Sequence, residues 1–467
     1  MLANHTPRHL LKFEVSKLFN VFDHSILFNQ ESGITIITAP NGYGKTAILR
    51  LINAFFLNQW KILFNITYEK MTLYFDEDFR ISVQHKKDDK KERLLFILKE
   101  KDKEQKYTIA LGGIDPRQFP LHLVDQIIPN LDRIASLAWR DLTDNKRLTF
   151  AEVMEKYGHV LIKEAGRYEI HAKEFVDMQS RDEKIPDWLV SATSSINCKF
   201  IETQRLLDFT SPRIDQRHTR KAAQAISVVE NQANHLKFAI QEKLAEFTNK
   251  SQELDRSFPH RVIKQASSKS ILDSNLQGHI DSLEDTRSKL VSVGILDPTE
   301  GYTPISMENA DQSTRSVLKV YVEDNVAKLS VFDSLYKKVS IFLEILNEKF
   351  ASKRPPGAKK LIRCNKDSGL VVETDDGKVV ELSELSSGEQ HEIVLFYDIV
   401  FKMDQHTFLL IDEPELSLHV NWQKKFVPDL LKIISSNKMR VLLATHSPQI
   451  VHDRRDLRVS LGVHRND

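Results

Sequence analysis

Two short stretches, far apart in the chain, carry the residues best suited to phosphate chemistry. The first is a glycine-containing loop that reads Thr38-Ala39-Pro40-Asn41-Gly42-Tyr43-Gly44-Lys45-Thr46. Glycines let backbone N–H groups turn inward toward an anion, a lysine here can reach the β- and γ-phosphates of a nucleoside triphosphate, and a threonine hydroxyl can ligate Mg²⁺. We therefore expect a nucleotide to be bound by the residues of this loop: Asn41, Gly42, Tyr43, Gly44, Lys45 and Thr46.

The second stretch is an apolar run, residues 408–411, that ends in two adjacent carboxylates, Asp412 and Glu413. A buried parallel strand presents its last residues at the edge of the sheet where ligands bind. Asp412 is then expected to hold Mg²⁺ together with Thr46, and Glu413 to polarise the attacking water as a general base. Taken alone, this pattern is equally consistent with a strand that ends in solvated acids.

The segments beside the glycine loop provide the context that such a loop requires. Residues 34–38 are a short β-branched run that predicts a buried strand, and residues 47–56 have one apolar helical face. Strand, glycine loop and helix together are typical of phosphate binding. Ala39 stands where the usual pattern has glycine, a position that a small residue can fill. The alternative is a surface turn that happens to contain these residues.

Two further segments could complete a site. Residues 384–390 precede an apolar helical pattern, so their serines and N–H groups could face an anion at a helix start, although an ordinary helix cap looks the same. His446 follows the apolar run 441–445, about one strand–helix–strand repeat after Asp412. This spacing predicts that His446 lies beside Asp412 and Glu413, near a γ-phosphate. A lone histidine after a strand is more often structural.

These motifs, in this order, resemble the ABC-type ATPase head of the SMC, Rad50 and RecF group. The resemblance implies that Lys45 is the Walker A lysine and that Asp412 and Glu413 are the Walker B pair. His446 matches the switch histidine, and Gln204 resembles the Q-loop glutamine that senses Mg²⁺ and the γ-phosphate. Nucleotide contacts are also assigned to the signature segment, which departs from Leu-Ser-Gly-Gly-Gln at two positions: Ser386, Ser387, Gly388 and Glu389.

The same resemblance implies an α/β fold: a P-loop ATPase head, with a mixed sheet and flanking helices, split by a helical arm. We expect residues 1–210 to form the N-terminal half of the head, 211–352 the coiled-coil arm and 353–467 the C-terminal half. In such heads the signature segment caps the nucleotide of a second subunit. The resemblance therefore implies a homodimer with ATP and Mg²⁺ at its interface, and further assembly beyond the dimer.

The N-terminal half contains segments that carry no motif. Strand-like patterns cover residues 10–30 and 68–113, and the charged run 86–93 predicts a hairpin tip or, as an alternative, a binding patch. Residues 114–190 read as a mixed, mostly helical insertion without an assigned role.

The arm is predicted from its periodicity. Apolar residues recur at spacings of three and four over residues 213–258, which predicts an amphipathic helix that Pro259 ends. Shorter helices are expected near 272–292 and 312–352. Residues 353–360 are basic and rich in turn formers, so we expect a linker back to the head, with a contact to phosphate backbones as the alternative.

Composition excludes several classes of protein. Lys and Arg number 66 against 65 Asp and Glu, and this near-zero net charge disfavours a dedicated nucleic-acid binder. Cys198 and Cys364 have no paired spacing, which favours a reducing compartment. No apolar run approaches the length of about eighteen residues that a membrane span needs, and the N-terminus lacks a signal-peptide core. We therefore expect a cytoplasmic protein without a membrane partner.

Three strings resemble the stand-alone ATPases of bacterial anti-phage systems: residues 386–392, residues 411–420 and residues 445–450. The families most similar are AriA of PARIS, which holds and releases the TOPRIM nuclease AriB, and PtuA of Septu, which carries the HNH nuclease PtuB. The resemblance favours the PARIS type and implies a separate nuclease effector and a phage-encoded trigger protein. Because the chain ends shortly after His446, we expect no nuclease domain of the OLD-family kind.

Three functions stay open at this point. The first is a defence ATPase that controls a partner nuclease, and the second is a DNA-repair ATPase of RecF type that binds DNA directly. The third is a nucleotide-locked scaffold with negligible turnover. The near-neutral charge disfavours the second function, and the paired acids Asp412 and Glu413 disfavour the third.

Overall fold

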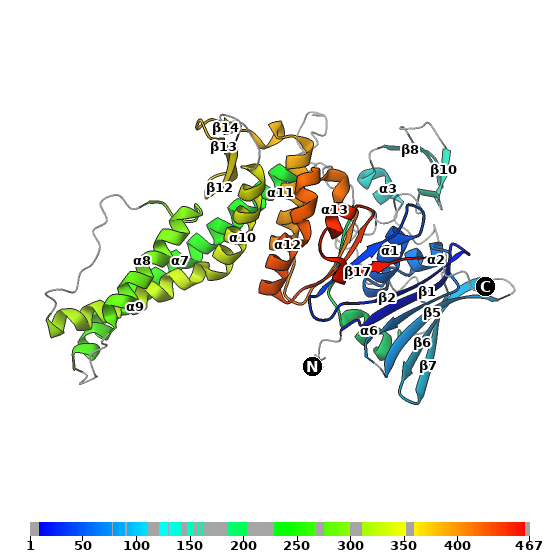
Figure 1. Ribbon diagram of the computed structural model, residues 1–467, viewed down its shortest axis with the longest axis horizontal. Helices are drawn as coiled ribbons and strands as arrows, with labels where there is room; N and C mark the ends of the chain where they lie inside the picture. The colour runs from blue at the N-terminus through cyan, green and yellow to red at the C-terminus, as the bar shows by residue number, and fades with distance from the viewer. Residues whose placement is uncertain are drawn as a thin grey trace.

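The computed structural model shows a head with a long helical arm (Figure 1). The structure describes residues 9–76, 78–88, 91–110, 121–128, 130–141, 147–150, 152–153, 157, 161, 185–202, 228–267, 275–298, 311–351 and 359–462. The predicted domain boundaries near residues 210 and 352 fall outside these ranges, so they stay predictions.

A five-stranded parallel sheet forms the centre of the head. Its strand order is β11 (Cys198–Ile201), β15 (Phe408–Asp412), β16 (Arg440–Thr445), β3 (Ile34–Thr38) and β17 (Arg458–Ser460), with every neighbouring pair parallel. The strands are short apolar runs because the sheet is covered on both faces, which leaves no position for alternating polar residues. The predicted strands at 34–38, 408–411 and 441–445 are confirmed.

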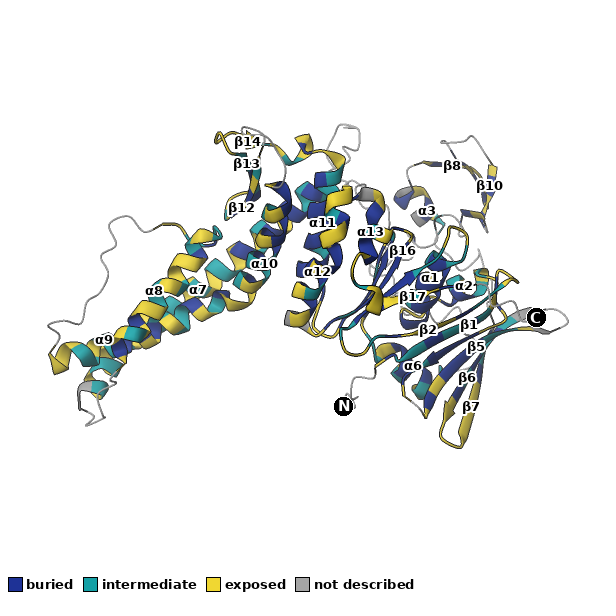
Figure 2. Cartoon of the chain, in the orientation of Figure 1, coloured by how far each residue is buried: buried dark blue, intermediate teal, exposed yellow. Residues whose placement is uncertain are grey.

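Alternate residues of this sheet enter two different cores. Figure 2 shows that strand β16 and the helices beside it are largely buried. Leu410 of β15 packs in the core that contains α1 (Lys45–Phe56), whereas Leu409 and Ile411 pack in the core that contains α11 (Ser387–Phe401) and α12 (Val420–Asn437). Helix α1 and helix α11 therefore cover opposite faces of one sheet, as expected for a period of two along each strand.

The α1 face is also covered by a six-stranded antiparallel sheet. Its order is β2 (Phe22–Leu27), β1 (Lys12–Leu18), β4 (Lys70–Tyr74), β5 (Phe79–Asp88), β6 (Lys91–Glu100) and β7 (Lys103–Ala110). The short helices α2 (Trp60–Asn65) and α6 (Asp187–Ser194) lie against the same core. Asp88 pairs with Lys91, so the predicted hairpin tip is confirmed, although residues 89–90 lie outside the described ranges.

The described part of the insertion at 114–190 is mixed, as predicted; more than half of the insertion lies outside the described ranges, so its mostly helical character stays a prediction. The described part contains α3 (His122–Ile127) and an antiparallel sheet of β8 (Leu131–Ala135), β9 (Ala138–Asp141) and β10 (Arg147–Thr149). These strands have three to five residues. Segments this short have no hydrophobic periodicity that distinguishes a strand from a helix. They form strands because β9 and β10 pair, with Trp139 opposite Leu148 in a buried cluster.

The arm consists of α7 (Val228–Ser267), α8 (Leu276–Ser292), α9 (Gln312–Leu329), the 3₁₀ turn η2 (Ser330–Phe332) and α10 (Asp333–Phe350). Figure 1 shows it extending away from the head. A small sheet of β12 (Lys360–Asn365), β13 (Gly369–Thr374) and β14 (Val379–Val380) packs at its root. A Cβ on Gly369 would lie 1.8 Å from the backbone oxygen of Ala233 on α7, so only glycine permits this contact.

The structure corrects the predicted end of the long helix at Pro259. Helix α7 continues to Ser267, although a proline inside a helix removes one backbone hydrogen bond. Arg261 donates from Nη2 to the backbone oxygen of Leu254 at 2.8 Å and to Asp324 Oδ2 of α9 at 2.7 Å. These contacts, one of them with the neighbouring helix α9, therefore stabilise α7 across the proline. They could not be predicted from the sequence around Pro259.

Lys360 also departs from the prediction of a linker over 353–360. It is the first residue of β12, and residues 352–358 lie outside the described ranges. Within the part of the chain that the structure describes, no helix is long and apolar enough to cross a membrane.

Candidate nucleotide-binding site

The glycine loop lies between β3 and α1, as the sequence predicts. Gly42 and Gly44 both have φ of 86°, and Gly44 is the residue immediately before the helix. A Cβ on Gly44 would lie 2.5 Å from Leu18 Cδ2, so the loop needs glycine there for space as well as for its backbone angle. The first N–H groups of α1 have no partner within the helix, which makes its start suited to bind an anion.

Thr46 and Asp412 meet at the carboxyl edge of the parallel sheet. Thr46 Oγ1 donates a hydrogen bond to Asp412 Oδ2 at 2.8 Å. Burial raises the pKa of Asp412 and nearby Glu413 raises it further, whereas the hydrogen bond from Thr46 opposes the shift. A buried carboxylate beside a second carboxylate is stabilised by a cation, so this position suits Mg²⁺.

Lys45 lies inside the loop that precedes it. Its side chain is 4% exposed, and Nζ donates to the backbone oxygens of Ala39 at 3.0 Å and Pro40 at 3.3 Å. Nζ also lies 3.9 Å from Glu413 Oε1. The ammonium group therefore stands between the loop carbonyls and the acid pair, where the triphosphate is expected.

Glu413 has an uncommon backbone conformation. Its φ and ψ are 41° and 58°, in the left-handed region, and its N–H donates to the backbone oxygen of Ala444 at 2.9 Å. Non-glycine residues adopt this conformation at an energetic cost and are often functional. Glu413 Oε1 lies 3.6 Å from His446 Nδ1, so the structure brings the predicted base and the predicted switch histidine together.

Glu415 is a site residue to which the sequence interpretation gave no role. It lies in the 3₁₀ turn η4 (Pro414–Ser417) and is 6% exposed. Its Oε1 accepts hydrogen bonds from Thr445 Oγ1 at 2.6 Å, from His446 N–H at 2.8 Å and from Ser447 N–H at 3.2 Å. His446 Nδ1 lies 3.1 Å from the same oxygen. One carboxylate therefore fixes the turn that carries His446.

A second polar link supports this turn. Ser447 Oγ donates to Gln423 Oε1 at 2.7 Å, and Gln423 Nε2 donates to the backbone oxygen of Leu418 at 3.0 Å. Gln423 belongs to α12, so the segment after Asp412 and the segment after β16 are joined through buried hydrogen bonds. The available sequence signal is a third acid, Glu415, two positions after Glu413.

The signature segment forms the start of α11, as predicted. Ser386 is the N-cap and makes a capping box with Glu389, whose Oε2 accepts from the Ser386 N–H at 2.8 Å. Glu389 is 2% exposed and its carboxylate also binds Lys360 Nζ at 3.0 Å. This carboxylate caps the helix, so a nucleotide contact by Glu389 stays a prediction that the geometry disfavours. Ser386 and Ser387 are exposed at the helix start, and Gly388 follows them, half-buried.

Gln204 lies outside the described residues, so its assignment stays a prediction. The strand that leads toward it is described, since Ile201 at the end of β11 pairs with Ile411 of β15. Glu202 follows, with Oε1 at 3.9 Å from Arg50 Nη2 of α1. The chain therefore leaves β11 at the same edge of the sheet as Asp412 and Glu413.

An aromatic group lies beside the loop. The rings of Phe22 and Tyr43 have centroids 5.0 Å apart, and His24 Nε2 lies 2.9 Å from the backbone oxygen of Tyr43. Phe22 and Tyr43 are both half-buried, so part of each ring is open to solvent. The sequence interpretation included Tyr43 but not the residues from β2 that support it.

This constellation defines a class of protein. A glycine loop joins a parallel strand to a helix, and an acid pair ends a strand two places away in the same sheet. Lys45, Thr46, Asp412, Glu413 and His446 converge there. The chain is a P-loop ATPase with an α/β head and a helical arm.

The comparisons with known proteins agree with this class. The family model described as AAA ATPase domain matches residues 19–451, so the chain belongs to the AAA ATPase domain family. The chain is also similar to the Retron Ec83 probable ATPase of Escherichia coli, with 29% identity over 159 residues. That match covers 31% of this chain and 28% of the relative, so it spans less than a third of either protein.

Solved structures of low sequence identity were also found. An Smc head domain with an extended coiled coil from Pyrococcus furiosus is 13% identical, covers 97% of this chain and 94% of that chain, and has a TM-score of 0.31. The SMC head domain from Thermotoga maritima is 10% identical over 95% of this chain and 91% of that chain, with a TM-score of 0.30.

Proposed function

We propose that the site binds ATP with Mg²⁺ and hydrolyses it through Glu413 as general base. The observation that carries this proposal is the meeting of Lys45 and Thr46, from the loop, with Asp412 and Glu413, from a strand more than 360 positions later. In this role Lys45 binds the β- and γ-phosphates, and Thr46 and Asp412 contribute oxygen atoms to the metal.

The oxygen atoms of Thr46 and Asp412 suit a metal ion whose remaining ligands come from the phosphates of the substrate and from water. The described residues contain no group of three or more His, Cys, Asp and Glu side chains that could hold an ion alone. Mg²⁺ is commonly held by one or two protein oxygens together with phosphate oxygens and water. When bound, the ion neutralises charge on the phosphates. Asp412 and Thr46 supply a suitable pair of oxygens, 2.8 Å apart.

The remaining residues orient the reacting groups. Glu413 polarises a water molecule for attack on the γ-phosphate, and His446, held by Glu415, contacts that phosphate. The open faces of Phe22 and Tyr43 offer a surface for the base. Gln204 completes the site as a sensor of the metal and the γ-phosphate.

The active form is a homodimer in which Ser386, Ser387 and Gly388 cap the nucleotide of a second subunit. Two observations support this arrangement. Helix α11 covers the sheet face opposite to α1, the helix that begins at the glycine loop of the same chain. Leu416 and Val420, beside the acid pair, are 59% and 54% exposed, and exposed apolar side chains are common at interfaces.

Mixing two inactive variants tests the dimer. Lys45→Ala removes nucleotide binding, and Ser387→Arg places a bulky cation on the capping surface; Ser383→Arg, on an exposed residue just before it, is the matched control. In a shared-site dimer, the mixture forms heterodimers with one intact site, so ATPase activity returns to about a quarter of wild type on statistical pairing. No recovery, with heterodimers present by mass measurement, would contradict the shared site.

The biological role that we propose is an ATP-dependent scaffold of an anti-phage defence complex, which holds a partner nuclease and releases it on sensing a phage protein. The similarity to a retron ATPase over 159 residues supports a defence role. A TOPRIM nuclease, as in PARIS, is the proposed partner, and an HNH nuclease, as in Septu, is the alternative. ATP binding or turnover would control release through the dimer.

Affinity purification from cells that carry the native neighbouring genes tests this role. We expect a small nuclease to copurify with the wild-type chain, and Glu413→Gln to retain it during phage infection. A matched strain that lacks the chain is the control for non-specific capture. If instead the purified chain is free of nuclease and duplex DNA stimulates its ATPase activity with a steep salt dependence, the DNA-repair function replaces the defence function.

A further inference from the structure

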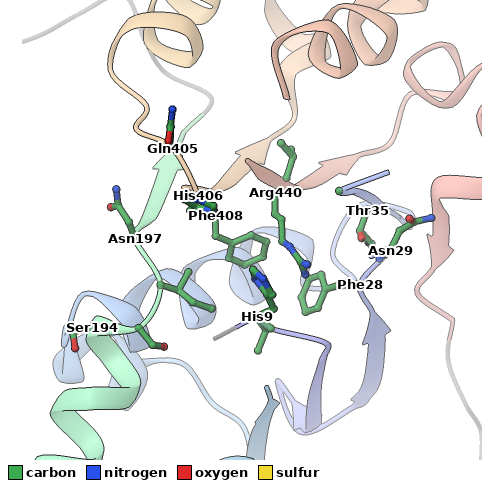
Figure 3. Close-up of a pocket in the computed structure, with 15 residues that line it drawn as sticks. His9, Phe28, Asn29, Thr35, Ser194, Asn197, Gln405, His406, Phe408 and Arg440 are labelled. Carbon is green, nitrogen blue, oxygen red and sulfur yellow. Dashed lines mark hydrogen bonds between the residues drawn. The ribbon is translucent and has the colours of Figure 1, made fainter. Parts of the chain in front are cut away.

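A second pocket lies at the edge of the parallel sheet opposite to the glycine loop (Figure 3). Its volume is about 230 Å³. The lining residues include Phe408 and Arg440, the first residues of β15 and β16, and Gly33 and Asn197, which directly precede β3 and β11. Because all four strands are parallel, this pocket lies at their amino ends, whereas the nucleotide-binding residues lie at their carboxyl ends.

The pocket gathers basic side chains without an acid. His9, His406 and Arg440 all line it, and none of the fifteen described lining residues is Asp or Glu. Burial lowers the pKa of His9, and the nearby charges of Arg440 and His406 lower it further. Burial also lowers the pKa of Arg440, whose guanidinium donates to the neutral amide of Gln30. Arg440 is therefore a half-buried cation with no carboxylate among the described lining residues, and an anion would pair with it.

The walls beside the basic groups are aromatic and apolar. The rings of Phe28 and Phe408 have centroids 5.5 Å apart and meet edge to face, and both residues are 5% exposed. Ile196 and Val441 continue this wall. A flat apolar body could lie against the aromatic wall, because ring contacts add to the free energy of burial.

The loop that presents His406 is held rigidly. His406 has φ of 62°, which is strained for a residue other than glycine. Thr407 beside it is fully buried, and its backbone oxygen accepts from the Arg440 N–H at 3.0 Å. Asn197 Nδ2 donates to Thr407 Oγ1 at 3.3 Å, and the Asn197 backbone oxygen accepts from the Phe408 N–H at 2.8 Å. Strained residues held by buried contacts are concentrated at binding sites.

We propose that this pocket binds a small organic anion, which carries a phosphate or carboxylate group on a flat apolar body. Arg440, His406 and His9 would bind the oxyanion, with the guanidinium presenting a planar set of donors. Phe28 and Phe408 would contact the flat body. A volume of about 230 Å³ suits a compound smaller than the drug-sized ligands of typical pockets.

The position of the pocket also links it to the ATPase site. Strand β15 begins at Phe408 in the pocket and ends at Asp412, and β16 begins at Arg440 and ends at Thr445, next to His446. The two sites are therefore connected by strands of five and six residues.

Calorimetric titration of the full chain with phenyl phosphate, benzoate and inorganic phosphate tests the proposal. We expect either phenyl phosphate or benzoate to bind, and the one that binds more tightly identifies the anionic group as a phosphate or a carboxylate. Inorganic phosphate, which has no apolar body, should bind more weakly. Arg440→Gln should weaken binding about 10- to 100-fold, as expected for loss of charge-assisted hydrogen bonds. Lys438→Gln, an exposed residue outside the pocket, is the matched control and should bind as wild type.

Two further variants keep the test decisive. His9→Gln should also weaken binding and serves if Arg440→Gln does not fold, as judged by its melting temperature. Lys45→Ala should leave binding unchanged, because the ATP site is at the other edge of the sheet. Three outcomes would each overturn the proposal. They are loss of binding in Lys45→Ala, wild-type affinity in both Arg440→Gln and His9→Gln, and no binding by the wild type at millimolar ligand. Equal affinity for inorganic phosphate would overturn the part played by the aromatic wall.

Discussion

Thr46 and Asp412, which are 366 positions apart in the chain, are joined by a 2.8 Å hydrogen bond between Thr46 Oγ1 and Asp412 Oδ2. Strand β16 lies between the strands that lead to them, so the bond spans the carboxyl edge of the sheet. The two halves of the head therefore form one site only when the central sheet is assembled.

Lys45→Ala is expected to abolish ATP binding. Its buried ammonium is the cation closest to Glu413 in the loop, and loss of a charge-assisted contact to phosphate should weaken binding about 100-fold or more. Titration with a fluorescent ATP analogue measures this change. Lys61→Ala, on the exposed side of α2, is the control and should bind normally. Unchanged affinity in Lys45→Ala would remove the loop from the site.

Glu413→Gln is expected to bind ATP and to hydrolyse it about 10²- to 10⁴-fold more slowly, the usual contribution of a general base. The amide keeps the size of the side chain but cannot accept the proton. Single-turnover hydrolysis measures the rate, and size-exclusion chromatography with ATP should show accumulated dimer. Turnover near the wild-type rate would place the base elsewhere, or would favour a scaffold in which hydrolysis has no role.

Glu415→Ala is expected to reduce kcat about 10- to 100-fold while changing the KM for ATP less than about threefold. The carboxylate does not touch the nucleotide in this proposal; it orients His446 through three accepted hydrogen bonds. Glu415→Gln retains one side-chain oxygen and should recover part of the activity. If both variants have a lower melting temperature but an unchanged kcat, Glu415 has only a structural role.

The buried charges between α10, α11 and α12 predict a pH dependence of stability. Lys349 Nζ lies 3.0 Å from both Glu392 and Asp429, and all three side chains are almost fully buried. Burial raises the pKa of Glu392 from 4.5 to about 7, because the carboxylate loses its hydration. The folded state therefore binds a proton more tightly than the unfolded state does. The stabilisation is complete below about pH 4.5 and is lost as the pH rises through about 7.

Urea unfolding at pH 5.5 and pH 8 measures this effect. The free energy of unfolding of the wild type, relative to Glu392→Gln, should be larger at pH 5.5 by on the order of 1 kcal/mol. Glu344→Gln, an exposed carboxylate on α10, is the control and should show no such difference. A difference that grows toward pH 8 would contradict the raised pKa.

The chemistry of the nucleotide site could be predicted from the sequence because each motif is local. The glycine loop, the apolar run followed by Asp412 and Glu413, and the serine that caps α11 all depend on residues a few positions apart. Short-range patterns of this kind indicate strands, turns and helix starts from the sequence alone. The placement of His446 beside Glu413 followed from the length of one repeat, and the 3.6 Å distance confirms it.

Other features were decided by contacts between distant segments. In the sequence, nothing distinguishes Glu415 from the other acids; its role appears only from the hydrogen bond that Thr445 donates to it. Arg261 stabilises α7 across Pro259 because Asp324 lies on the neighbouring helix α9. The basic pocket depends on His9, just before β1 of the antiparallel sheet, and Arg440, which begins β16 of the parallel sheet, so it forms only when segments from opposite ends of the chain pack together. Sequence periodicity reports which face of an element is buried, but the partner on that face is selected by packing and by the pairing of buried polar groups.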